Sequence, residues 1–199
     1  MEPIILASSS QRRHNFFRLL GLPFTVMPPE IDETPVRGFS PRQVSEDLAI
    51  RKIQATVESL KNKKDENAAN WIFAADTMVV LNGKIRGKPK NRSDAAAMLH
   101  SLAGHRHEVI TSMALYNREN EKTDCRSVTC EVTFAQLSPA EIEWYLKMGE
   151  WQGAAGAYQM QSLGGCLIKS INGSPSAVAG LPLHDFYVML RGNGYHIGA

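Results

Sequence analysis

A carboxylate and a hydroxyl interrupt the apolar run from Trp71 to Leu81, where Asp76 and Thr77 stand side by side. Such a run is typical of a buried strand pair or of one long interior strand. An ionised aspartate loses hydration there, so it needs a cation, a hydrogen-bond donor or a shifted pKa. Because Gly87-Lys88-Pro89 follows soon after, Asp76 could belong to a binding site for a phosphate and its metal. A buried aspartate that caps a turn is the other interpretation.

Groups that suit phosphate occur at three further places. The segment Ser8-Ser9-Ser10-Gln11-Arg12-Arg13 stands between an expected strand and an expected helix, where backbone N–H groups and guanidinium groups can bind an anion. Lys52 and Lys88 supply point charges for phosphate oxygens. The alternatives are a Ser-capped helix with solvated arginines and ordinary surface lysines.

Two other segments could bind a metal and a base. Glu30-Ile31-Asp32-Glu33 is an acidic loop, and Glu33 with Asp76 would suffice for a nucleotide-bound Mg²⁺, which uses one or two carboxylates plus phosphates. Gln161 stands near the end of the glycine-rich segment 149–165 and could read a base edge through its paired donor and acceptor. A solvated loop and an exposed glutamine are the alternatives.

Composition restricts the class of protein. The 199 residues are 43% hydrophobic and 21% charged, which is typical of a soluble globular protein with one domain, or one domain with two lobes. A formal net charge of +2 gives no strong field for nucleic acid or for an acidic membrane surface. Cys125, Cys130 and Cys166 form no Cys-x-x-Cys pair, and a buried free thiol is expected at Cys130. With no apparent secretory signal or membrane span, we predict a cytoplasmic protein.

Strands and helices mix along the chain, which predicts an α/β fold with a mixed sheet. We expect a hairpin turn at Asn82-Gly83, an exposed loop over 61–70, a segment over 149–165 that crosses between lobes, and a loose tail over 192–199. The expected strands are 3–7, 24–27, 71–81, 107–116, 128–134 and 164–171, and the expected helices follow Arg13, Ser40, Asn91, Ser138 and Pro182.

Taken together, these motifs resemble the Maf family of nucleotide pyrophosphatases. The resemblance runs in order along nearly the whole chain, so that it does not depend on any single motif. It is carried by residues 6–13, 31–34, 48–52, 75–77, 87–89, 102–111, 155–161, 171–174 and 180–183.

The resemblance implies a two-lobed, Maf/ITPase-like fold with an active-site cleft, in one domain over 1–191 followed by the tail. It implies a homodimer that uses Mg²⁺ or Mn²⁺ to hydrolyse dTTP and UTP to the monophosphate and pyrophosphate, with a role in removing unwanted nucleotides and restraining septum formation. Thr77 after Asp76, with Tyr158 and Gln161 later, indicates this branch rather than the one acting on 7-methyl-GTP. A regulator that only binds nucleotides and a septum protein without catalysis stay open as alternatives.

The resemblance also assigns roles to residues. By the resemblance Asp76 is the expected proton acceptor, and Arg12, Thr77 and Gln161 are the expected base-selecting residues. The residues themselves suggest Glu33 and Asp76 as metal ligands, and they suggest phosphate binding by Ser8, Ser10, Arg12, Arg13, Lys52 and Lys88.

The chain departs from the family pattern at several positions. Gln11 stands where the family usually has proline, and Trp151, Gly153 and Ala154 replace a proline, an aspartate and a lysine. Gln159 and Ser162 replace two glycines, which could alter the rim of the pocket and the preference for a base.

Overall fold

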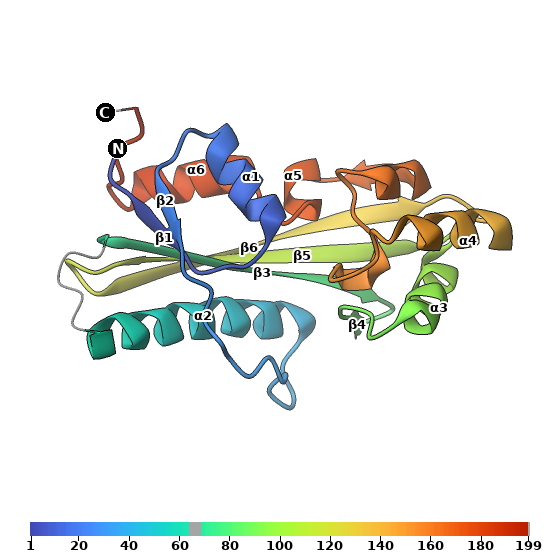
Figure 1. Ribbon diagram of the computed structural model, residues 1–199, viewed down its shortest axis with the longest axis horizontal. Coiled ribbons are helices and arrows are strands. Elements are labelled where there is room, and N and C mark those ends of the chain that lie inside the picture. Colours follow the sequence, from blue (N-terminus) through green and yellow to red (C-terminus); the bar gives the residue numbers. More distant parts are fainter. Residues whose placement is uncertain (64–68, 199) are drawn as a thin grey trace. The chain divides into compact units, whose positions relative to one another are not determined.

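Figure 1 shows the computed structural model, which describes residues 1–63 and 69–198. Within these residues seven strands form one mixed sheet in the order β2-β1-β3-β5-β6-β7, with β4 paired to β3. The predicted α/β fold with a mixed sheet is therefore confirmed. The strands are β1 (Ile4–Leu6), β2 (Phe24–Val26), β3 (Trp71–Leu81), β4 (Lys84–Arg86), β5 (Arg106–Asn117), β6 (Lys122–Phe134) and β7 (Ile168–Asn172).

The chain divides into two compact units. Unit 1 comprises Met1–Asp76, Thr111–Val128 and Gly180–Ala199, and unit 2 comprises Thr77–Ile110 and Thr129–Ala179. Unit 1 contains the helices α1 (Gln11–Leu19), α2 (Pro41–Lys63) and α6 (Leu183–Gly192). Unit 2 contains α3 (Arg92–Leu102), α4 (Pro139–Met148), α5 (Pro175–Val178) and the short 3₁₀ helices η1 (Ala155–Ala157) and η2 (Leu163–Leu167). None of the helices in the described residues is both long and apolar enough to cross a membrane.

In unit 1 both faces of the parallel strands are buried. Figure 1 shows α1 and α6 on one side of these strands and α2 on the other. On the first side Phe73 packs against Phe186 of α6, with ring centroids 4.6 Å apart, and against Phe17 of α1 at 5.6 Å. On the second side Ile72 joins a buried cluster with Ile53 of α2. Burial on both faces explains why the first part of β3, Trp71 to Ala75, is a continuous apolar run rather than an alternating one.

The parallel pairing places three segments at one edge of the sheet. β1 pairs in parallel with β2 and with β3, with Leu6 opposite Val26 and Phe73, and the Ala7 N–H extends the pairing to the Phe73 carbonyl at 2.8 Å. The carboxyl ends of parallel strands meet at the same edge, where ligands bind in open α/β sheets. The Ser8–Arg13 segment follows β1, the acidic loop follows β2, and Asp76 lies three residues beyond Phe73.

In unit 2 the local signals formed the elements that they predict. Asn82 and Gly83 both have positive φ, at 52° and 73°, and join β3 to the antiparallel β4. Ser138 and Glu141 form a capping box at the start of α4, and Gly149 ends that helix with φ of 76°. Cys130, Val132 and Phe134 of β6 are buried, and β6 is antiparallel to β7. The thiol of Cys130 is buried, as predicted, and forms no disulfide among the described residues.

Three sequence-based expectations on elements are wrong. Residues 164–171 do not form one strand, because Gly164 and Gly165 belong to η2 and β7 begins at Ile168. The glycine-rich segment 149–165 lies wholly within unit 2 and does not cross to unit 1. The predicted loop over 61–70 begins too early, because α2 continues to Lys63, and residues 64–68 lie outside the described part of the chain.

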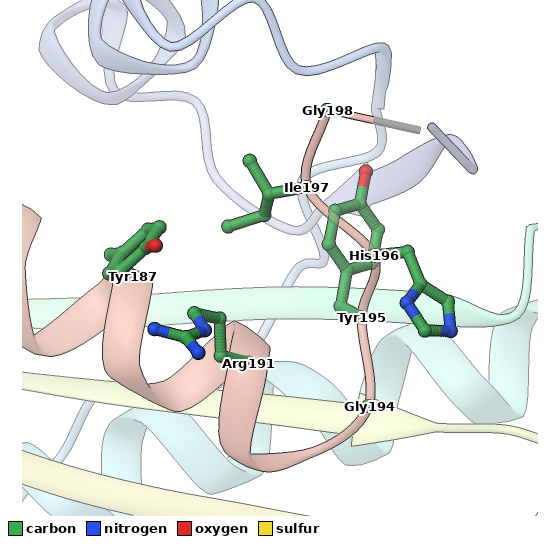
Figure 2. A pocket seen from close by; sticks show the side chains of 7 residues that line it. All are labelled: Tyr187, Arg191, Gly194, Tyr195, His196, Ile197 and Gly198. Carbon is green, nitrogen blue, oxygen red and sulfur yellow. The ribbon is translucent and has the colours of Figure 1, made fainter.

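The tail is also packed more firmly than expected, because Tyr195 is only 3% exposed. Its ring meets Trp71 edge-on, and its hydroxyl donates to the Glu2 carbonyl at 2.6 Å. Figure 2 shows a pocket that the tail forms with α6, beside Tyr187 and Arg191. No residue expected in the active site lines this pocket, so we do not assign the reaction to it.

Candidate active site

Lys52 contacts both Asp76 and Glu33, the two carboxylates that the sequence predicts as metal ligands. Its Nζ donates to Asp76 Oδ1 at 2.7 Å and lies 3.3 Å from Glu33 Oε1. The side chains of Lys52 and Asp76 are 14% and 12% exposed, whereas Glu33 is 50% exposed. The interior acid therefore has the cation that its burial requires, and the turn-cap interpretation of Asp76 does not hold.

Helix α2 holds Asp76 at two points. Lys52 binds its carboxylate, and the fully buried Ser45, two turns earlier on α2, donates its hydroxyl to the Asp76 carbonyl at 3.4 Å. Ser45 and Lys52 are seven residues apart, so they lie on the same face of the helix. The apolar residues of that face anchor α2 to the sheet, with Leu48, Ala49 and Ile53 all buried. Packing of α2 thus sets the position of the lysine.

Arg51 holds the acidic loop against α2. Its Nη1 donates to the Asp32 carbonyl at 2.5 Å and its Nη2 donates to the Thr34 carbonyl at 3.2 Å. The Asp32 carboxylate accepts the Thr34 N–H at 2.8 Å, and hydrogen bonds from Thr34 lower the pKa of Asp32. Arg51 and Lys52 are neighbours in the chain: Arg51 fixes the acidic loop, and Lys52 contacts Glu33 of that loop. Sequence reasoning did not assign this role to Arg51.

A buried arginine lies in the same unit. Arg13 is 8% exposed, and it donates to the Gly180 carbonyl at 3.0 Å and to Ser8 Oγ at 3.1 Å. Burial lowers the pKa of Arg13 to about 10, while the charge of Asp76 acts to raise that pKa. The group stays charged at neutral pH. Ser8 Oγ also accepts the Ser10 N–H at 3.2 Å, so the hydroxyl helps to fix the guanidinium.

The N-terminus of α1 suits an anion. Ser10 occupies the N-cap, and among the described residues its hydroxyl makes no capping hydrogen bond. The first turn carries Arg12 and Arg13 and no acid, so no side chain in that turn offsets the positive end of the helix dipole. A polyphosphate at the free N–H groups would supply the missing negative charge.

Thr77, Lys88 and Gln161 belong to unit 2. Thr77 follows Asp76 on β3, so the two side chains point to opposite faces of the strand. Lys88 is exposed, in the loop after β4. The Gly87 carbonyl accepts the Gly156 N–H at 3.1 Å, which ties the Lys88 loop to η1. Gln161 is exposed and donates from Nε2 to Gln159 Oε1 at 2.9 Å.

The segment before Gln161 is fixed by a buried aromatic cluster. The Tyr158 hydroxyl and His107 Nε2 are hydrogen-bonded at 2.8 Å, and both rings pack edge-on against Phe134. Burial lowers the pKa of His107 to about 4 and raises the pKa of Tyr158. The histidine is therefore neutral at physiological pH and takes part in the packing of this cluster.

The donor set near Lys52 fits a hard divalent cation in its chemistry. Glu33 and Asp76 both offer carboxylate oxygens to the same ammonium. No group of three or more His, Cys, Asp or Glu side chains in the described residues could hold a metal on its own. Two carboxylates are enough where substrate phosphates complete the ligand set, which is the usual arrangement for nucleotide-bound Mg²⁺.

Comparison with known proteins gives full-length matches. The family model described as Maf-like protein matches residues 3–193. A dTTP/UTP pyrophosphatase of Symbiobacterium thermophilum is 41% identical over 197 residues, covering 99% of this chain and 97% of that protein. Proteins with the same name from Pelotomaculum thermopropionicum and Shewanella frigidimarina are 39% and 42% identical, covering 99% and 90% of this chain and 100% and 91% of their own.

The structural comparison is much weaker. A crystal structure of protein VC0702 from Vibrio cholerae shares 11% identity and a TM-score of 0.33, covering 76% of this chain and 72% of that one. A likeness at this level supports no conclusion on fold or function. The family model and the full-length relatives agree, and on that ground the chain belongs to the Maf family.

Proposed function

We propose that this chain is a nucleoside triphosphate pyrophosphatase that hydrolyses dTTP and UTP to the monophosphate and pyrophosphate. The observation that carries the proposal is the contact of 2.7 Å between Lys52 Nζ and Asp76 Oδ1, inside an otherwise apolar strand. A buried acid beside a lysine, with a buried cation at Arg13, suits the hydrolysis of an anionic substrate. The full-length relatives named dTTP/UTP pyrophosphatase support the choice of substrate.

In this reaction a water molecule attacks the α-phosphorus. An oxygen–phosphorus bond forms, the bond from the α-phosphorus to the bridging oxygen breaks, and pyrophosphate leaves with that oxygen. Asp76 accepts the proton of the attacking water, and Lys52 holds the carboxylate in position. Arg13 and Lys52 stabilise the negative charge on the phosphate oxygens as the transition state forms.

The remaining site residues divide between phosphate and base. Arg12, Thr77 and Gln161 select the pyrimidine, with Arg12 also close to the phosphates. The triphosphate is bound by Ser8, Ser10, Arg12, Arg13, Lys52 and Lys88. The N-terminus of α1, where Ser10 makes no capping hydrogen bond, supports the roles of Ser8, Ser10, Arg12 and Arg13. The hydrogen bond from the Gly156 N–H to the Gly87 carbonyl, which fixes the loop that carries Lys88, supports the role of Lys88.

We further propose that Mg²⁺ or Mn²⁺ binds at Glu33 and Asp76. Such an ion would supply a positive charge that neutralises part of the negative charge of the substrate phosphates. Lys52 contacts both carboxylates, so beside the ion it would neutralise part of their charge. The family resemblance also leads us to expect a cytoplasmic homodimer.

Product analysis tests the reaction. UTP, dTTP, CTP, GTP and 7-methyl-GTP are each incubated with the protein and Mg²⁺, and we expect pyrophosphate from UTP and dTTP. Asp76→Asn should lower kcat by about 10²- to 10⁴-fold, the usual contribution of a general base. Asp185→Asn in α6 serves as the matched control with wild-type turnover.

Four results would contradict the proposal. Release of inorganic phosphate would exclude attack at the α-phosphorus. Unchanged turnover in Asp76→Asn would remove that residue as the base. Tight binding of UTP without any turnover would favour the nucleotide-binding regulator, and a septum protein without a nucleotide site would bind none of the five nucleotides.

A further inference from the structure

Glu150 organises the loop that carries Gln161. Its carboxylate accepts hydrogen bonds from the Ser162 hydroxyl and from the N–H groups of Leu163 and Gly164, the latter two at 3.2 Å. Burial acts to raise the pKa of Glu150, but these hydrogen bonds outweigh it and the pKa is lowered. The carboxylate is therefore charged at neutral pH, and it fixes the loop through its hydrogen bonds to residues 162–164.

The main chain at Gln159 is fixed from two further directions. The Tyr145 hydroxyl accepts the Gln159 N–H at 3.1 Å. A Cβ at Gly164 would lie 2.5 Å from the Gln159 carbonyl oxygen, so only glycine allows the two segments to approach this closely. The backbone that carries the Gln159 side chain is consequently well defined.

Two side-chain amides form a relay on this backbone. Gln159 donates from Nε2 to the Glu150 carbonyl at 2.7 Å, and Gln161 donates from Nε2 to Gln159 Oε1 at 2.9 Å. A backbone carbonyl only accepts, so the NH₂ group of Gln159 must face it. The Oε1 of Gln159 must then face Gln161, so the NH₂ group of Gln161 faces Gln159. The Oε1 of Gln161 therefore points away from Gln159, that is, outward.

Orientation matters because pyrimidines differ at N3. Uracil and thymine have an N3–H donor between two carbonyl acceptors, whereas cytosine has an N3 acceptor beside an amino donor. An outward Oε1 on Gln161 can accept the N3–H, and its second N–H can donate to a neighbouring carbonyl. Cytosine would require the reversed amide, which brings the Oε1 atoms of Gln161 and Gln159 together without a hydrogen atom between them.

We propose that Gln159 is a specificity-determining residue, which fixes the amide of Gln161 so that the site takes pyrimidines with an N3–H and disfavours cytosine. This inference rests on the proposed function, in which Gln161 contacts the base. Gln159 stands where the Maf pattern usually has glycine, so the relay is a property of this chain and not of the general motif. The residue acts through Gln161 and does not itself need to touch the substrate.

The test compares two variants at one position. Gln159→Met keeps the bulk of the side chain without polar atoms, and Gln159→Gly removes the side chain altogether. Loss of one orienting hydrogen bond should lower the ratio of kcat/KM for UTP to kcat/KM for CTP about five-fold in both variants. Gln152→Met, in the exposed turn after α4, is the matched control and should keep the wild-type ratio.

A binding measurement separates recognition from chemistry. In the Asp76→Asn background, the Kd values of UTP, CTP and 3-methyl-UTP are measured by calorimetry with and without Gln159→Met. We expect 3-methyl-UTP, which lacks the N3–H, to bind about as weakly as CTP when Gln159 is present. The advantage of UTP over both should shrink about five-fold when Gln159 is replaced.

The outcomes distinguish this inference from the proposed function. A wild-type protein that releases no pyrophosphate from UTP or dTTP would refute the proposed function. If it does release pyrophosphate, an unchanged ratio of UTP to CTP in both folded Gln159 variants would overturn the role of Gln159. A wild-type protein that binds UTP, CTP and 3-methyl-UTP equally well would overturn it too.

Discussion

Gly156 occupies a position that a methyl group should disrupt, and the chain contains its own control. Gly156 has φ of 66°, and a Cβ built there would lie 2.8 Å from Val79 Cγ2 and 3.0 Å from its Cγ1 and Cβ. Gly153 has nearly the same φ, 67°, but a Cβ there would have nothing within 4 Å. Gly153→Ala therefore measures the backbone cost alone, and Gly156→Ala adds the collision with β3.

The expected magnitudes follow from these two costs. An L-residue in the left-handed region costs about 1–2 kcal/mol, so Gly153→Ala should lower the free energy of unfolding by about that amount. Overpacking a buried site adds about 1–3 kcal/mol, so Gly156→Ala should lower it by about 2–5 kcal/mol. For a chain of this size, each kcal/mol corresponds to a drop in Tm of about 2–4 °C.

Urea unfolding and thermal melting of the two variants provide the assay. Val79→Ala removes both Cγ atoms, so in the Gly156→Ala background it should restore part of the lost stability, with a coupling of about 1–3 kcal/mol. If Gly156→Ala and Gly153→Ala lower the free energy of unfolding equally, the predicted collision with Val79 is refuted. It is also refuted if the effects of Gly156→Ala and Val79→Ala on the free energy of unfolding are strictly additive.

Two other predictions concern Lys52 and His107. Lys52→Met should lower kcat/KM for UTP by about 10²- to 10³-fold, because it removes a preorganised donor to the charge that develops, whereas Lys61→Met on the same helix should leave steady-state kinetics unchanged. His107 has a pKa of about 4 when folded and about 6.5 when unfolded, so the unfolded chain binds more protons between these values. The free energy of unfolding should therefore fall by up to about 1.4 kcal/mol per pH unit as the pH drops from about 6.5 to about 4. The free energy of unfolding, measured by urea titration at several pH values, should depend less steeply on pH in His107→Gln than in His100→Gln, which changes an exposed histidine. An equal dependence on pH in the two variants would contradict the buried histidine as the cause.

The sequence predicted the part of the site that depends on local pattern. A carboxylate in an apolar run needs a cation, and Lys52 is the cation that the structure places beside Asp76. The segments after β1 and β2 were recognisable because helix starts and loops follow apolar strands, and parallel pairing brings such strand ends to one edge. The catalytic and binding roles of these residues stay predictions.

Tertiary contacts that leave no local signal were beyond sequence reasoning. Nothing in the sequence around Arg51 distinguishes it from other charged helix residues, yet it binds two carbonyls of the acidic loop. Tyr195 stands among glycine and polar residues near the end of the chain, so nothing nearby indicates that its ring packs on Trp71. The apolar pattern predicts a strand that includes Gly164 and Gly165, whereas the structure has both in the 3₁₀ helix η2, where the backbone of Gln159 and Met160 approaches them closely.

The division of the chain also bears on how the proposed reaction can be altered. The boundary between the units falls between Asp76 and Thr77, which are neighbours on β3 with side chains on opposite faces of the strand. The proposed general base belongs to unit 1, and Gln161 with its relay belongs to unit 2. Lys52 and Arg51 belong to α2 of unit 1, whereas Gln161 is held through Gln159 and Glu150 in unit 2. Substitutions near Asp76 should consequently lower turnover for every base, whereas substitutions around Gln159 should change the ratio between bases.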